Sequence, residues 1–90
     1  MFSIWKYPIP IEDFIIIEMP ADAKILGVQC QNGKPQMWAM IDPNLSKEQR
    51  VFRVIGTGQV IPEQQSRFSY IGTFQIESKG LVFHLFEYFR

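Results

Sequence analysis

The segment VFRVIGTGQVIP, residues 51–62, contains Gly56-Thr57-Gly58, which could hold a phosphate group or only bend the chain. A nucleotide-binding P-loop needs a longer glycine loop that ends in Lys-Ser or Lys-Thr and opens a helix, and a dinucleotide fingerprint needs a third glycine. Here Gln59-Val60-Ile61-Pro62 follows instead. We therefore interpret the segment first as a bend or bulge, and second as a turn whose N–H groups meet an anion.

His84 and Cys30 are each the only residue of their type. His84 alternates with Phe83 and Leu85 in an apolar segment, and no cluster of Cys, Asp or Glu accompanies it at metal-ligand spacing. A catalytic pair with Cys30 would lack a group that activates the thiol. We therefore predict a protein that is not an enzyme and that uses no metal and no cofactor.

The carboxylates offer no acid–base pair either. Glu12 and Asp13 are adjacent, so in a strand their side chains point to opposite faces. Asp42 precedes a proline, and we expect its side chain to cap a turn.

Polar residues alternate with apolar ones in several segments, which predicts a polar sheet face. Its members are Gln29, Gln31, Trp38, Arg53, Thr57, Thr73, Gln75 and His84. If these segments share a sheet, they suit a small planar, anionic ligand, because Arg53 supplies charge, Trp38 a stacking surface, and the amides and hydroxyls hydrogen bonds. The ordinary alternative is a solvated sheet face. The predicted ligand-binding residues are Trp38, Arg53, Gly56, Thr57, Gly58, Thr73, Gln75 and His84.

The elements that position these residues are short strands separated by turns. The pattern predicts an all-β, or β-rich α+β, single domain over residues 1–90: a compact antiparallel β-sandwich or small barrel of about seven strands. Two hairpins, 24–42 and 68–89, are expected from Asn32-Gly33 and from Ser78-Lys79-Gly80. The final strand, 81–89, is apolar on both faces, so we expect it to be central in its sheet or covered on both faces.

Alternation also assigns side chains to faces. It places Leu26 with Val28 and Cys30, and Trp38 on the same sheet face as Arg53. It also places Phe68, Tyr70, Phe74 and Ile76 together on one face of their strand. Asp42-Pro43 is expected to begin the one short helical segment, a turn or a 3₁₀ piece, because Ser46 to Gln49 has the spacing of a capping box. Residues 60–67 are expected to form a loop.

Charge and composition limit the partners. Nine basic residues balance nine acidic ones, so we expect neither duplex nucleic acid nor a membrane as a partner. The first residues do not resemble a signal peptide, and a single cysteine fits a reducing cytosol. Because 47% of the residues are hydrophobic in so short a chain, we expect a homo-oligomer, for which strand 81–89 is a candidate interface.

The sequence resembles a family of small, mostly uncharacterised phage and prophage proteins. The resemblance covers nearly the whole chain and is most specific at Tyr70-Ile71-Gly72-Thr73-Phe74-Gln75 and Leu81-Val82-Phe83-His84-Leu85-Phe86-Glu87. Further matching segments are Ile4-Trp5-Lys6-Tyr7, Met19-Pro20, Ile25-Leu26-Gly27-Val28-Gln29, Gln31-Asn32-Gly33, Trp38-Ala39, Asp42-Pro43 and Gly56-Thr57-Gly58. The resemblance implies a phage accessory protein in the host bacterial cytoplasm, but no catalytic residue.

Together these observations predict a non-enzymatic phage accessory protein that binds a small anionic ligand, most concretely a counter-defence protein that sequesters a nucleotide-derived immune signal. One alternative is a protein inhibitor of a host defence or CRISPR component. Another is a virion or accessory structural protein. Origin alone does not decide between them.

Overall fold

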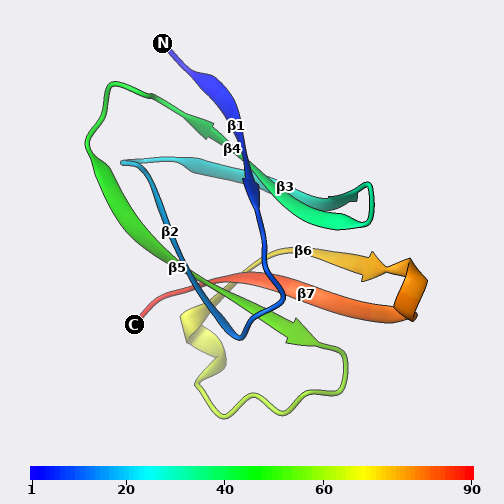
Figure 1. Cartoon of the computed structure of the whole chain (residues 1–90). Coiled ribbons are helices and arrows are strands. Elements are labelled where there is room, and N and C mark those ends of the chain that lie inside the picture. Colours follow the sequence, from blue (N-terminus) through cyan, green and yellow to red (C-terminus); the bar gives the residue numbers. More distant parts are fainter.

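The computed structural model describes residues 1–90 and is all-β, as predicted (Figure 1). Seven strands alternate with turns, and the only helical pieces are two short 3₁₀ helices. The elements are β1 (Ser3–Pro8), β2 (Phe14–Pro20), β3 (Lys24–Gln31), β4 (Lys34–Ile41), β5 (Lys47–Gly56), η1 (Gln65–Arg67), β6 (Phe68–Ile76), η2 (Glu77–Lys79) and β7 (Leu81–Tyr88).

The strands form two antiparallel sheets. One has the order β1-β4-β3 and the other the order β2-β5-β7-β6. Both predicted hairpins are present: β3 pairs with β4 across Asn32-Gly33, whose φ angles are 53° and 76°, and β6 pairs with β7 after Gly80, whose φ is 64°. Positive φ at both central residues is what a two-residue hairpin turn of type I′ requires. As expected, the apolar strand β7 is central, between β5 and β6.

The core fills the space between the two sheets. Alternate residues of β4, namely Met37, Ala39 and Ile41, are buried there, as their spacing predicts. They face Phe52 of β5 and Leu85 of β7, which are 0% exposed. Burial of large apolar side chains of this kind stabilises the fold by about 1.5–3 kcal/mol each.

Two β-bulges change the faces that simple alternation predicts. The register of β3 shifts between Ile25 and Gly27, so Leu26 is 44% exposed while Val28 is buried. The register of β6 shifts between Tyr70 and Gly72, so Phe68 and Tyr70 lie opposite outward residues of β7, whereas Phe74 is in the core. The predicted groupings of Leu26 with Val28, and of Tyr70 with Phe74, are therefore wrong, because an extra residue in a bulge reverses the side-chain parity beyond it.

The two sheets approach each other most closely where β3 crosses β6. A Cβ added at Gly72 would lie 2.8 Å from Val28 Cγ1, which is closer than van der Waals contact. In the same region the Cys30 thiol donates to the carbonyl oxygen of Gln75 at 3.0 Å. Gly72 therefore permits the close packing of the two strands.

Asp42-Pro43 does begin a turn, in which the Leu45 N–H donates to the Asp42 carbonyl oxygen at 3.2 Å. No helical piece follows at Ser46–Gln49, because β5 begins at Lys47 and pairs with β2 over residues 47–53. Tertiary pairing overrides the capping-box pattern there. Asp42 caps the turn between β4 and β5, as expected, since its Oδ1 accepts the Asn44 N–H at 3.0 Å. The loop expected at 60–67 ends in the 3₁₀ helix η1. No helix in the chain is long and apolar enough to cross a membrane.

Candidate ligand-binding site

The predicted polar face is divided between the two sheets. Trp38 lies on β4 and Arg53 on β5, and these strands belong to different sheets. The prediction that the two side chains share a sheet face is therefore wrong. Parity within each strand is correct, since Trp38 alternates with buried Met37 and Ala39, but parity cannot tell which strands become neighbours.

Arg53 is buried on the outer face of the β2-β5-β7-β6 sheet and is only 3% exposed. Its Nε donates to the carbonyl oxygen of Asp13 at 2.8 Å, and its Nη1 lies 3.0 Å from Glu63 Oε2. Its guanidinium carbon lies 4.1 Å from the centroid of the Phe14 ring. One hydrogen bond, one ion pair and the Phe14 ring, all from the same chain, thus occupy the charge that was expected to meet a ligand.

An aromatic cluster surrounds this arginine. Phe68 and Tyr88 lie next to it, with ring centroids 5.4 Å from the guanidinium carbon. Phe86 makes edge-to-face contacts with Phe68 and Tyr70 at centroid distances of 5.5 and 5.6 Å. Beside these rings is an open pocket of about 310 Å³, lined by Ile61, Glu63, Gln65, Phe68 and Phe86.

Gly56-Thr57-Gly58 is a turn, in agreement with the first interpretation. The Gly56 N–H donates to Gln59 Oε1 at 3.1 Å, and the Thr57 N–H donates to the Val82 carbonyl oxygen at 3.2 Å. The Gly56 carbonyl oxygen accepts the Gln59 N–H at 3.0 Å, and Gly58 has a φ of 88°. An anion cradle needs successive free N–H groups, and only that of Gly58 is left unbonded.

Next to this turn, four side chains form a continuous row of hydrogen bonds, which we call the His84 row: Tyr70, Thr73, His84 and Thr57. The Thr57 hydroxyl lies 2.8 Å from His84 Nε2, and the Thr73 hydroxyl lies 3.0 Å from His84 Nδ1. The Tyr70 hydroxyl lies 2.5 Å from the Thr73 hydroxyl. Each hydroxyl can both donate and accept, so the row accommodates either tautomer of His84.

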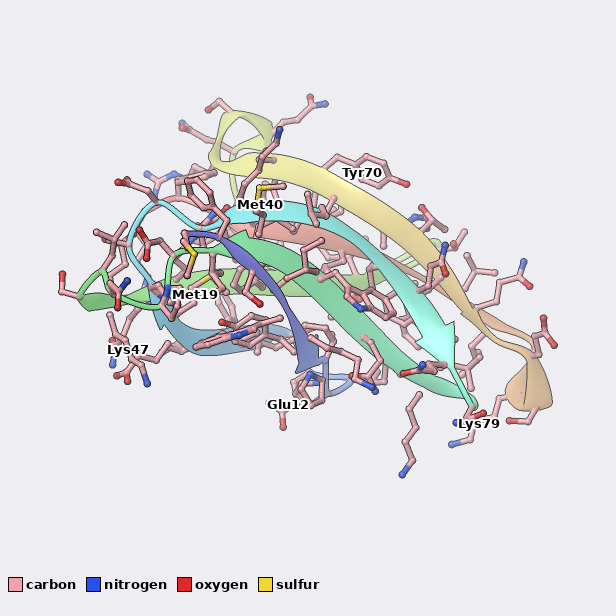
Figure 2. All side chains as sticks on the ribbon, turned by 90° about the horizontal axis from the view of Figure 1, so that it is seen from above. Glu12, Met19, Met40, Lys47, Tyr70 and Lys79 are labelled. Atoms are coloured by element: carbon pink, nitrogen blue, oxygen red, sulfur yellow. The ribbon has the colours of Figure 1, made fainter.

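The row comes from three different elements. Thr57 follows β5, Thr73 and Tyr70 belong to β6, and His84 belongs to β7. His84 and Thr73 are direct cross-strand partners, and the bulge in β6 brings Tyr70 to their face. Thr57, Thr73 and Tyr70 are exposed and His84 is half-buried, so solvent reaches the row. Figure 2 shows Tyr70 extending from β6 away from the body of the protein.

The structure therefore brings together five of the predicted site residues, Gly56, Thr57, Gly58, Thr73 and His84, and separates the rest. Gln75 is exposed two residues further along β6, Arg53 is buried, and Trp38 is on the other sheet. Sequence reasoning missed Tyr70, because the bulge could not be seen. It also missed Gln59, whose Nε2 donates to Asp13 Oδ1 at 3.2 Å and so ties the turn to the start of β2.

A second ionic site lies at the end of the sandwich. Arg50 binds Glu87 through two bonds of 2.7 Å each and also donates to the Ala23 carbonyl oxygen. The hydrogen bond to Glu87 raises the pKa of Arg50 above its ordinary value, although burial opposes this. The paired geometry identifies these residues as a structural clamp between the turn before β3 and strands β5 and β7.

The sequence matches a domain of unknown function, DUF7352, over residues 1–89. The chain belongs to the DUF7352 family. No curated protein and no solved structure shows a significant match to it.

Proposed function

We propose that this DUF7352 chain is a non-enzymatic binding protein that receives a small planar ligand on the outer face of the β2-β5-β7-β6 sheet, at the His84 row. The observation that carries the proposal is the convergence of hydroxyl and imidazole groups from three elements on a solvent-accessible surface. Folding alone does not require polar groups to be joined in this way on an exposed sheet face, where water would satisfy them.

Binding fits this geometry better than catalysis. A threonine hydroxyl 2.8 Å from a histidine nitrogen could be a nucleophile and its base, but the second His84 nitrogen meets the Thr73 hydroxyl instead of a carboxylate. The Gly56 and Thr57 N–H groups, which might stabilise an oxyanion, donate to groups of the same chain. Both features favour recognition without a reaction.

The ligand that suits the row is a planar ring with hydrogen-bonding edges. Thr57 and Thr73 can bond such edges, and the Tyr70 ring, which is 60% exposed, can stack on the ring face. The most concrete version is the base of a nucleotide-derived immune signal, sequestered by a phage-type protein in the host bacterial cytoplasm. Because Arg53 is already paired with Glu63, this site recognises the base more than the phosphate.

The test is calorimetric titration with matched nucleosides, mononucleotides and cyclic dinucleotides. Thr73→Val keeps the shape of the side chain and removes its hydroxyl, so we expect it to weaken binding by about tenfold, the usual effect of one lost hydrogen bond. Ser69→Ala removes another exposed hydroxyl of β6 and serves as the control. If no member of the panel binds, or if Thr73→Val binds as tightly as the wild type, the proposal is wrong.

A second candidate function is the inhibition of a host defence protein through direct contact. It is favoured by exposed apolar side chains: Ile16 of the edge strand β2 is 58% exposed, and Val60 of the loop after β5 is 85% exposed. An exposed edge strand is a template for a strand of another protein. In this case Ile16→Lys would abolish co-purification of one defined host protein while leaving nucleoside titrations unchanged.

A further inference from the structure

The outer face of the β1-β4-β3 sheet has a regular arrangement of side chains that the proposed function does not use. Trp38 lies at its centre, with Lys6 of β1 opposite on one side and Gly27 of β3 opposite on the other. In the next row Gln36 lies opposite Gln29. These residues alternate with the buried residues of β4, so they all point outward.

The strands of this face carry only positive charge. The strands β1, β3 and β4 contain three lysines, Lys6, Lys24 and Lys34, and no aspartate or glutamate. The two ion pairs of the chain are Arg50–Glu87 and Arg53–Glu63, so none of these lysines is paired with a carboxylate. Lys6 Nζ instead donates to Gln31 Oε1 at 2.7 Å. Because Lys6 is on β1 and Gln31 on β3, this bond keeps the ammonium group over the sheet face. The neutral net charge of the whole chain conceals this local excess.

Trp38 has an open slot beside it. A pocket of about 300 Å³ is lined by Leu26, Gly27, Val28, Gln29 and Trp38. A Cβ added at Gly27 would meet no atom within 4 Å, so the missing side chain leaves free space next to the indole. The slot therefore offers a flat aromatic surface to one planar ring, with the Gln29 amide nearby to bond its edge.

The charges are spread further than a single nucleotide reaches. Lys34 lies opposite Gln31 at one end of the face, and Lys24 lies opposite Met40 at the other. The two rows are six positions apart along β4, from Lys34 to Met40, which is about 20 Å at the usual rise of an extended strand. Trp38 lies between them, so a ligand that contacts both ends must be a chain that passes over the indole.

We propose that the β1-β4-β3 face binds single-stranded nucleic acid, with one base stacked on Trp38 in the slot beside Gly27 and with phosphates near Lys6, Lys24 and Lys34. A basic surface that carries an aromatic platform is the chemistry by which proteins hold unpaired strands, because every base has a face that stacks. A duplex hides those faces and does not fit the slot. An acidic polypeptide would match the charge but would have no use for the indole.

The test is fluorescence anisotropy with a short labelled oligothymidylate and oligouridylate at low salt. We expect saturable binding that weakens as salt is raised, because counterions are released from the strand. Trp38→Ala should weaken binding at least tenfold, and Trp38→Phe should restore most of it. An added Cβ at Gly27 meets no atom within 4 Å, so we expect Gly27→Leu to fill the slot and weaken binding with little loss of melting temperature.

The charge contribution has a matched control. Replacing Lys6, Lys24 and Lys34 together by glutamine should weaken binding at least tenfold and flatten its salt dependence. Replacing Lys47, Arg67 and Lys79, which are exposed but lie outside these strands, removes the same charge and should have little effect. The proposal is overturned if no strand binds at low salt, if the control set weakens binding equally, or if Gly27→Leu and Trp38→Ala bind like the wild type. Equal competition by polyglutamate would also overturn it and indicate an acidic protein partner.

Discussion

At the level of single residues, Arg53 is a buried cation whose main role is to stabilise the fold. Its side chain is 4% exposed, stacks on Phe14 and meets Glu63, whose side chain is 24% exposed. Arg53→Ala leaves a largely buried carboxylate without its partner, so we expect the free energy of unfolding to fall by about 3 kcal/mol. Thermal and urea unfolding measure this, and Arg67→Ala, which removes an exposed arginine, is the control.

A different result for Arg53→Ala would contradict this structural role. If Arg53→Ala unfolds at the same temperature as the wild type but loses a ligand, then Arg53 contacts that ligand and the ion pair with Glu63 opens on binding. Glu63→Gln distinguishes the cases, because it should destabilise the free protein only where the pair exists in it.

The two glycines of the turn should respond differently to alanine. Gly58 has a φ of 88°, which alanine adopts only with strain, so Gly58→Ala should lower stability by about 1 kcal/mol. Gly56 lacks a positive φ, and an added Cβ would lie 3.7 Å from the Phe83 ring, an ordinary contact. Gly56→Ala should therefore unfold within about 0.5 kcal/mol of the wild type. Equal losses in both variants would contradict this description of the turn.

Tyr7 predicts a pH effect. Its hydroxyl is buried without a hydrogen-bond partner, and this desolvation raises its pKa above the ordinary value of 10.0. The folded state then holds the proton more tightly than the unfolded state, so this contribution is complete below about pH 10 and is lost as the pH rises through the higher folded pKa. Tyr7→Phe should lose less stability than the wild type between neutral and strongly alkaline pH. If the free energy of unfolding falls equally with pH in both proteins, burial does not raise the pKa of Tyr7.

At the level of elements, the packing of β6 on β3 depends on Gly72. Alanine there would bring its Cβ to 2.8 Å from Val28 Cγ1, and the stiff β-branched side chain cannot rotate away easily. We expect Gly72→Ala to lower stability by about 1–3 kcal/mol, as overpacking does. Val28→Ala in the same chain should recover part of the loss, which a double-mutant cycle measures as a coupling energy. Strictly additive losses would mean that the contact is not tight.

The strands and the hairpins were predictable because their signals are local. Asn32-Gly33 specifies its turn through two positive φ angles, and Met37, Ala39 and Ile41 alternate without interruption. The bulges at Leu26 and Ile71 were not predictable, since a bulge adds one residue without a distinctive sequence. The start of β5 was missed for a related reason: pairing with β2 decides it, and that partner lies far away in the chain.

The candidate site was predictable in part. Thr73 and His84 follow from strand parity and from the β6–β7 hairpin, which places them opposite each other. Trp38 and Arg53 were separated because alternation fixes a face within a strand but not the sheet to which the strand belongs. The burial of Arg53 depends on Glu63 in a loop, and no pattern in the sequence connects the two.

At the level of the whole molecule, we retain the prediction of a homo-oligomer but not the interface on strand 81–89. Strand β7 is central in its sheet, and Phe86 packs against Phe68 and Tyr70 of the same subunit. Phe86→Asp should therefore lower the melting temperature rather than dissociate an assembly. Light scattering measures the mass, and a monomer at micromolar concentration would end the prediction. The exposed apolar residues left for an interface include Ile16 and Phe89, which are 58% and 53% exposed.

The central claim is that a ligand binds at the His84 row. The most direct test is a titration of isotope-labelled protein with a cyclic dinucleotide and its parent nucleoside, followed through the backbone amide resonances. We predict saturable shifts with a common midpoint at Thr57, Thr73 and His84, and none at Gly27 or Trp38 on the other sheet. The absence of shifts at millimolar ligand, or shifts confined to Trp38 and its neighbours, would contradict the claim.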